Sequence, residues 1–103
     1  MISVTFYKNG SDYLGFEMKG HSDYAEEGKD IVCASVSSAA YLTANNITDF
    51  FNINADVTVS DGYMKLTAEK SDNLNRLLDG FYHHLLQLSG QYQKDIKLKI
   101  SEV

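Results

Sequence analysis

The sequence predicts an α+β fold: a two-layer α/β sandwich, with a mostly antiparallel five-stranded sheet and two helices on one face, in the order ββαββαβ. Five short segments alternate apolar and polar residues with the period of a strand. Two longer segments repeat apolar residues with helical spacing, and turn residues separate successive strands. A chain of 103 residues is long enough for one core, so we expect a single domain over residues 1–103.

The first two strands form a predicted hairpin. Residues 2–8 and 13–20 both alternate, and the turn residues Asn9-Gly10-Ser11-Asp12 join them. The alternation places Leu14 on the buried face and Tyr13 on the opposite face. A polar loop over residues 21–29 follows.

The rest of the chain repeats this pattern. Residues 30–51 carry apolar or small side chains with helical spacing and predict the first helix. Residues 53–68 alternate around an Asp-Gly turn and predict a second hairpin. Ser71 is suited to cap the second helix and Gly90 to end it. Residues 96–100 predict the last strand.

The predicted outer face of the sheet is polar and rich in tyrosine. Its side chains are Thr5, Tyr7, Tyr13, Glu17, Tyr63, Lys65, Lys97 and Lys99. The tyrosines either form a dimer interface, since aromatic residues are enriched in interface cores, or simply cover the sheet.

Composition narrows the class of protein. The net charge of −5 argues against nucleic-acid binding, which depends on Lys and Arg, and suits a basic peptide or protein partner. There is no apolar run of membrane-spanning length. A single cysteine and the absence of a signal-peptide pattern lead us to expect a cytoplasmic protein.

His21 and Cys33 are the candidate catalytic pair, separated by twelve positions. If Asp30 is the N-cap of the first helix, Cys33 lies in its first turn, where the helix dipole favours a thiolate. His21, at the end of a strand, would be close enough to act as the base of a Cys/His site. The alternative is that Cys33 is a small buried core residue and His21 a structural histidine.

Two further residues have candidate roles near this pair. Asp30 either caps the helix or accepts a hydrogen bond from His21 and orients its ring. Ser37 lies one turn after Cys33, so it is a candidate site-lining residue. It lacks the Gly-flanked elbow of a serine nucleophile. Backbone N–H groups near Cys33 are suited to stabilise an oxyanion.

The loop before the helix is either an ordinary solvated connection or a mobile substrate flap, bracketed by glycines. Its residues are Ser22, Asp23, Tyr24, Ala25, Glu26, Glu27, Gly28 and Lys29. As a flap it would order over a bound peptide, and its acidic residues would suit a basic substrate.

No metal site is expected. His83 and His84 are adjacent on a helix and point about 100° apart, so they do not face one ion together. We interpret them as surface residues.

The segment from Gly20 to Ser37 resembles the Prp (YsxB-like) ribosomal-processing cysteine proteases, and the resemblance extends over essentially the whole chain. It is carried by Gly20, His21, Tyr24, Ala25, Gly28, Asp30, Ile31, Val32, Cys33, Ala34, Val36 and Ser37. Ser22 departs from the small residue, often Ala, that the family has after its histidine.

The resemblance implies a cysteine endopeptidase that removes a short N-terminal extension from a large-subunit ribosomal protein. Cys33 would be the nucleophile and His21 the base, with an apolar subsite nearby, no metal or organic cofactor, and a homodimeric state. Two alternatives stay open: a non-catalytic ribosome-associated assembly module, and a thiol-dependent redox or acyl-transfer enzyme.

Overall fold

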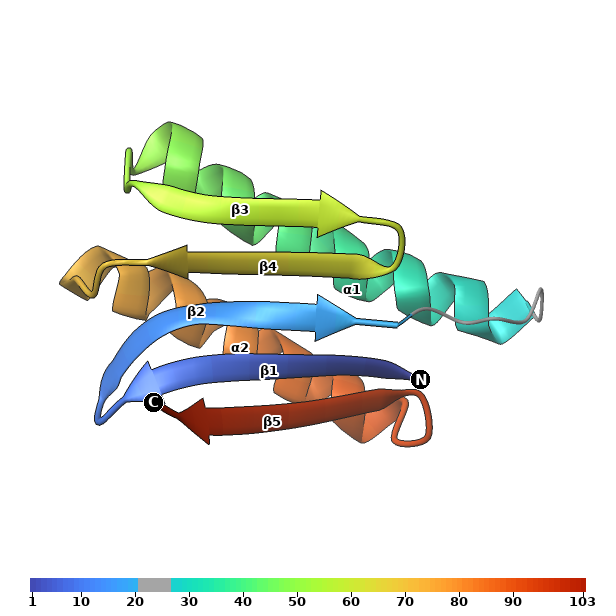
Figure 1. Ribbon diagram of the computed structural model, residues 1–103. Coiled ribbons are helices and arrows are strands. Elements are labelled where there is room, and N and C mark those ends of the chain that lie inside the picture. The colour runs from blue at the N-terminus through green and yellow to red at the C-terminus, as the bar shows by residue number, and fades with distance from the viewer. Residues whose placement is uncertain (21–26) are drawn as a thin grey trace.

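The protein is a two-layer sandwich in the predicted order ββαββαβ. A computed structural model describes residues 1–20 and 27–103, and for residues 27–30 it describes the backbone alone. Figure 1 shows the sheet in front and both helices behind it, on one face. The strands are β1 (Ile2–Asn9), β2 (Asp12–Lys19), β3 (Ala55–Ser60), β4 (Tyr63–Ala68) and β5 (Ile96–Glu102). The helices are α1 (Glu27–Asn45), with the π-helical turn η1 (Asn46–Phe50) at its end, and α2 (Asp72–Gln91).

The sheet is mixed, with the strand order β3-β4-β2-β1-β5. Three of its pairings are antiparallel, and β5 is parallel to β1. The parallel pairing follows from α2, which carries the chain across the sheet between β4 and β5. Strands β3 and β5 are therefore the two edges.

One core fills the space between the sheet and the helices. The most buried large side chains are Phe6, Phe16, Ile47, Met64, Leu66, Leu74, Leu78 and Leu85. Phe6 lies at the centre of an aromatic cluster, with its ring 5.5 Å from that of Phe81 and 5.9 Å from that of Tyr13. Truncating such a side chain to Ala typically costs about 3–5 kcal/mol.

The prediction for Tyr13 and Leu14 was wrong, because a β-bulge interrupts the alternation of β2. Tyr7 pairs with Gly15 and Lys8 pairs with Tyr13, so Leu14 is an extra residue opposite β1. The bulge turns Tyr13 into the core, where it is 4% exposed and its hydroxyl donates to Asp79. Leu14 points to the other face, where it lines a surface depression with Tyr7.

The first helix begins earlier than predicted, and its last turn is π-helical. It starts at Glu27, so residues 27–29 are helical and do not belong to the loop. Glu and Lys are good helix formers, and their propensity outweighs that of Gly28. After Asn45 the helix widens into η1. Phe50 and Phe51, the last apolar residues of the predicted helix over residues 30–51, are exposed.

The second helix begins as predicted and ends later. Ser71 is its N-cap, and the Ser71 hydroxyl accepts a hydrogen bond of 3.1 Å from the backbone N–H of Leu74. Its apolar stripe is buried against the sheet. Gly90 does not end the helix, which continues to Gln91 and closes with a bond from the N–H of Tyr92 to the carbonyl of Leu88.

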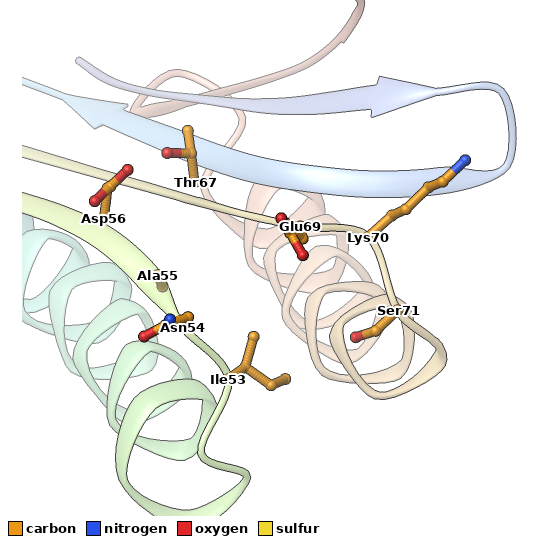
Figure 2. A pocket seen from close by; sticks show the side chains of 8 residues that line it. All are labelled: Ile53, Asn54, Ala55, Asp56, Thr67, Glu69, Lys70 and Ser71. Atoms are coloured by element: carbon orange, nitrogen blue, oxygen red, sulfur yellow. The ribbon is translucent and has the colours of Figure 1, made fainter.

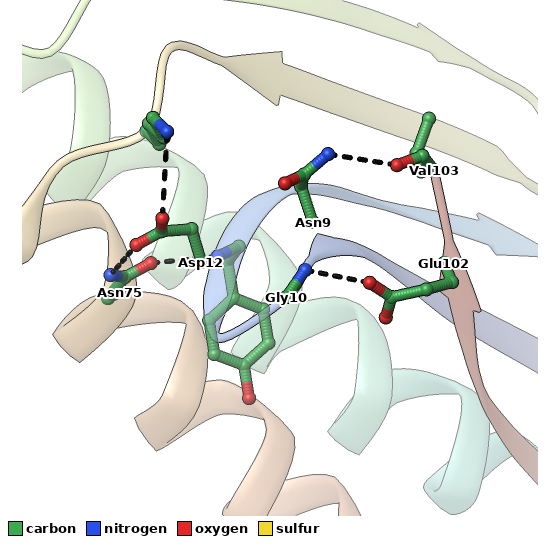
Figure 3. Close-up of polar contacts among 8 residues, drawn as sticks. Asn9, Gly10, Asp12, Asn75, Glu102 and Val103 are labelled. Atoms are coloured by element: carbon green, nitrogen blue, oxygen red, sulfur yellow. Dashed lines mark hydrogen bonds and ion pairs between the residues drawn. The ribbon is translucent and has the colours of Figure 1, made fainter.

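Polar contacts fasten the β1–β2 turn to both flanking elements (Figure 3). The N–H of Gly10 donates to Glu102 at 2.7 Å, and the Asn9 amide donates to the carbonyl of Val103 at 3.0 Å. On the other side, the Asn75 amide donates to Asp12 at 2.9 Å and its carbonyl accepts from the N–H of Tyr13 at 2.8 Å. The turn thus ties α2 and β5 to the first hairpin.

Candidate active site at helix 1

Cys33 lies in the second turn of α1, half-buried against the core. The helix turns its apolar positions Val32, Val36 and Ala40 toward the sheet, four residues apart. Cys33 lies next to this stripe, packs against the apolar core and is partly exposed as a residue. The prediction that Cys33 lies in the first turn was wrong, because the helix begins at Glu27 and not after Asp30. A helix dipole acts mainly within the first turn, so it does less for Cys33 than expected.

Ser37 shares a face with Cys33. The two residues are four positions apart on α1, and both are half-buried. Both side chains are small.

Gly20 anchors the chain immediately before His21. Its N–H donates to the carbonyl of Gly62 at 2.9 Å, which joins the end of β2 to the β3–β4 turn. Its φ of +96° suits glycine, and a Cβ there would overlap the carbonyl oxygen of Met1. His21 therefore follows a residue that is held firmly at this end of the sheet.

Several predicted site residues lie outside the described part of the chain. His21, Ser22, Asp23, Tyr24, Ala25 and Glu26 are among them, so the His21–Cys33 pair and most of the predicted flap stay predictions. Glu27, Gly28 and Lys29 belong to α1, which corrects the predicted extent of the loop.

The interpretation of Asp30 as the helix N-cap was wrong. An N-cap residue precedes the first helical residue, whereas Asp30 comes three residues after Glu27, inside the helix. The alternative role, in which Asp30 orients His21, stays a prediction.

An apolar groove of about 570 Å³ runs between the two helices. Residues of α1 such as Ser35, Ala39 and Leu42 form one wall, and Leu77, Phe81 and Leu88 of α2 form the other. At 100° per residue, Cys33 lies on the opposite flank of α1 from these groove residues. The groove therefore does not supply the apolar subsite expected beside the thiol.

A more polar hollow of about 530 Å³ opens where β3 begins and β4 ends (Figure 2). Its lining residues are Ile53, Asn54, Ala55, Asp56, Thr67, Glu69, Lys70 and Ser71. It lies at the opposite end of these strands from Gly20 and Gly62 and contains neither Cys nor His. Cleavage chemistry is thus not expected there.

The histidines of α2 are on the surface, as predicted. His83 contacts the backbone carbonyl of Asp79 through Nδ1 at 2.8 Å, and His84 is on the rim of the inter-helix groove. Among the side chains that the structure describes, those of residues 1–20 and 31–103, no three His, Cys, Asp or Glu are grouped as a metal would require.

The sequence placed Tyr7, Glu17 and Tyr63 on one face of the sheet, but it did not predict that they form a hydrogen-bonded cluster there. The Glu17 carboxylate accepts hydrogen bonds from Tyr63 at 2.6 Å and Tyr7 at 3.1 Å, and Lys19 lies 3.6 Å away. The bond from Tyr63, assisted by that from Tyr7 and by nearby lysines, holds the Glu17 pKa below its usual range, against the opposing effect of burial. Only the register that puts β2 between β1 and β4 reveals this cluster.

In the described part of the chain, neither helix combines the length and apolarity needed to cross a membrane.

Comparison with known proteins points to one family. The family model described as cysteine protease Prp matches residues 1–97. The ribosomal processing cysteine protease Prp of Bacillus subtilis is 27% identical over 95% of this chain and 96% of its own. The Prp of Staphylococcus aureus is 26% identical over 79% of this chain and 80% of its own.

Solved structures share the fold. An essential ribosomal processing protease Prp from S. aureus, crystallised with a covalently linked product peptide, has a TM-score of 0.87 at 25% identity, over 98% of this chain and 100% of that one. The Streptococcus mutans protein SMU.848 has a TM-score of 0.90 at 24% identity, over 100% of this chain and 96% of that one.

Proposed function

Since the chain belongs to the cysteine protease Prp family, we propose that it is an endopeptidase that removes the short N-terminal extension of a large-subunit ribosomal protein. The observation that carries the proposal is Cys33, the only cysteine of the chain, which is half-buried and partly accessible on α1. The names of the relatives, ribosomal processing cysteine proteases, support the substrate class. The S. aureus relative with a covalently linked product peptide supports a peptide as the ligand.

The chemistry divides peptide cleavage into two steps. His21 accepts the thiol proton, and the sulfur of Cys33 attacks the scissile carbonyl carbon to form a tetrahedral intermediate. Its collapse breaks the C–N bond, and His21 returns the proton to the leaving amine. Water, deprotonated by His21, then hydrolyses the thioester and frees the carboxylate. Asp30, which does not cap the helix, is assigned to orienting His21.

Cleavage of synthetic N-terminal peptides of ribosomal proteins, with the products located by mass, tests the proposal. Cys33→Ala and Cys33→Ser are expected to lose cleavage by at least about 10³-fold, since no other thiol replaces the nucleophile. His21→Ala is expected to lose about 10²–10⁴-fold as the base is removed. Asp30→Asn is expected to lower the rate with little change in melting temperature.

Matched controls separate chemistry from folding. His84→Ala removes an exposed histidine from α2 and is expected to leave the rate unchanged. Circular dichroism of every variant reports whether the fold survives. Near wild-type cleavage by Cys33→Ala would rule out the protease. A Cys33 that resists alkylation in the folded protein would favour an assembly module instead.

A further inference from the structure

We infer that the open face of the sheet, the face without helices, binds single-stranded RNA through its phosphate groups. This function goes beyond peptide cleavage and uses none of the residues assigned to it. Either proposal can therefore fail without the other.

The strand register defines the residues on this face. Three cross-strand rows span the five strands: Thr58, Lys65, Glu17, Thr5 and Lys99; Ser60, Tyr63, Lys19, Ser3 and Lys97; and Asp56, Thr67, Gly15, Tyr7 and Ser101. The core residues Phe6, Phe16 and Leu66 alternate with them along the strands and point to the helices. Lysines and hydroxyl groups dominate the three rows, and Figure 1 shows no element covering them.

The charge on this face is opposite to that of the whole molecule. Its rows contain four lysines and only two carboxylates, a net charge of +2, whereas the chain carries −5. The remaining residues therefore carry −7. The expectation that the chain does not bind nucleic acid rested on its total charge, but the field at a surface depends on where the charges lie.

The main acidic residue of the face is turned inward. The Glu17 side chain is 16% exposed, while that of Lys19 is 61% exposed. Both carboxylate oxygens accept hydrogen bonds from tyrosine hydroxyls, of Tyr7 and Tyr63. Solvent and any partner thus meet the ammonium groups before the carboxylate.

The spacing of the lysines suits a chain of phosphates. Neighbouring strands are about 4.8 Å apart. Lys97 and Lys19 have one strand between them, so their backbones lie about 10 Å apart, and Lys99 and Lys65 are about 14 Å apart. A single RNA strand can follow such a span with several consecutive phosphates.

The composition favours RNA over a second copy of this chain. Cores of protein interfaces are apolar and depleted in lysine. Serine and threonine hydroxyls beside lysines are typical phosphate contacts, and tyrosines on a sheet can stack with unpaired bases. Tyr7 and Tyr63 are half-buried and fixed by Glu17, and the Lys65 ammonium lies 5.4 Å from the centroid of the Tyr7 ring.

Anisotropy of a fluorescent 20-nucleotide single-stranded RNA, titrated at several salt concentrations, tests the inference. With four lysines engaged, log K is expected to fall against log salt with a slope of about −3. Lys97→Ala/Lys99→Ala is expected to weaken binding at least about tenfold at low salt and to reduce the slope to about −1.4. Peptide cleavage by this variant is expected to stay unchanged.

The control is Lys70→Ala/Lys94→Ala, which removes the same charge from residues outside the three rows. It is expected to bind RNA like the wild type. Absence of RNA binding at low salt, or an equal loss in both double variants, would overturn the inference. Competition by poly-glutamate as effective as that by unlabelled RNA would also overturn it, in favour of an acidic protein partner.

Discussion

Glu17 shows how one residue organises a surface. It lies between two tyrosines on neighbouring strands, and its carboxylate accepts a hydrogen bond from each phenolic hydroxyl. The Tyr63 bond raises the pKa of that tyrosine and lowers the pKa of Glu17, so the pair stays as phenol and carboxylate near neutral pH. The carboxylate thereby fixes the tyrosines and compensates part of the lysine charge around them.

Glu17→Gln is expected to make the stability of the protein less dependent on pH between pH 3 and pH 7. Because the folded-state pKa of Glu17 lies below its ordinary value of 4.5, its stabilising effect is fully present above that value and is lost as pH falls through the folded-state pKa. The wild type should therefore melt at a higher temperature than the variant at pH 7, and the difference should shrink by pH 3.

Thermal melts of both proteins between pH 3 and pH 7 measure this difference. Glu69→Gln, which changes an exposed carboxylate just after β4, is the control. A difference that stays constant over this range would contradict the assigned role of Glu17.

At the scale of the element, the β2 bulge decides which side chains reach the core. By inserting Leu14, it rotates Tyr13 inward onto Phe6 and Asp79. It also brings the backbone of Gly15 against β4, where a Cβ would overlap the carbonyl oxygen of Leu66. Glycine at this position permits the close approach of the two strands.

Gly15→Ala is expected to destabilise the protein by about 2–4 kcal/mol, because the strands must separate to admit the methyl group. Urea denaturation measures the change. Gly80→Ala is the matched control: Gly80 is inside α2, with nothing within 4 Å of an added Cβ. That variant should be stabilised by up to about 1 kcal/mol. Equal effects of the two substitutions would contradict the close approach at β4.

The same elements show what the sequence can predict. Period-two alternation identified all five strands, and helical spacing identified both helices, because burial on one face imposes these periods on any sequence. The bulge escaped prediction because it arises from cross-strand pairing. The start of α1 was misplaced because Asp30 resembles a cap, although the helix already begins at Glu27. The sequence identified Cys33 as the candidate nucleophile. It assigned Cys33 to the first turn of the helix instead of the second, because the start of α1 was misplaced.

At the scale of the whole molecule, the exposed large apolar side chains are separated from the lysine-rich open face of the sheet. Exposed large apolar side chains of the described part, apart from the chain ends, lie on the helices or on the helix side of the edge strands; they include Ile31, Tyr41, Leu42, Phe50, Leu86, Val57 and Ile100. The open sheet face carries lysines instead. A self-association surface is therefore expected in the helical layer.

The homodimer stays a prediction. The position of the exposed apolar side chains predicts which surface the two copies share, namely the helical layer. Leu42, 62% exposed on α1, is the test position, because a charge there would have to be buried unpaired in a dimer that uses the helical layer. We expect the wild type to sediment as a dimer and Leu42→Glu as a folded monomer. Lys99→Glu, on the open face, should remain dimeric. If the Lys99→Glu variant dissociates while Leu42→Glu stays dimeric, the open face of the sheet is the dimer interface. RNA and the second copy of the chain would then compete for the same lysines.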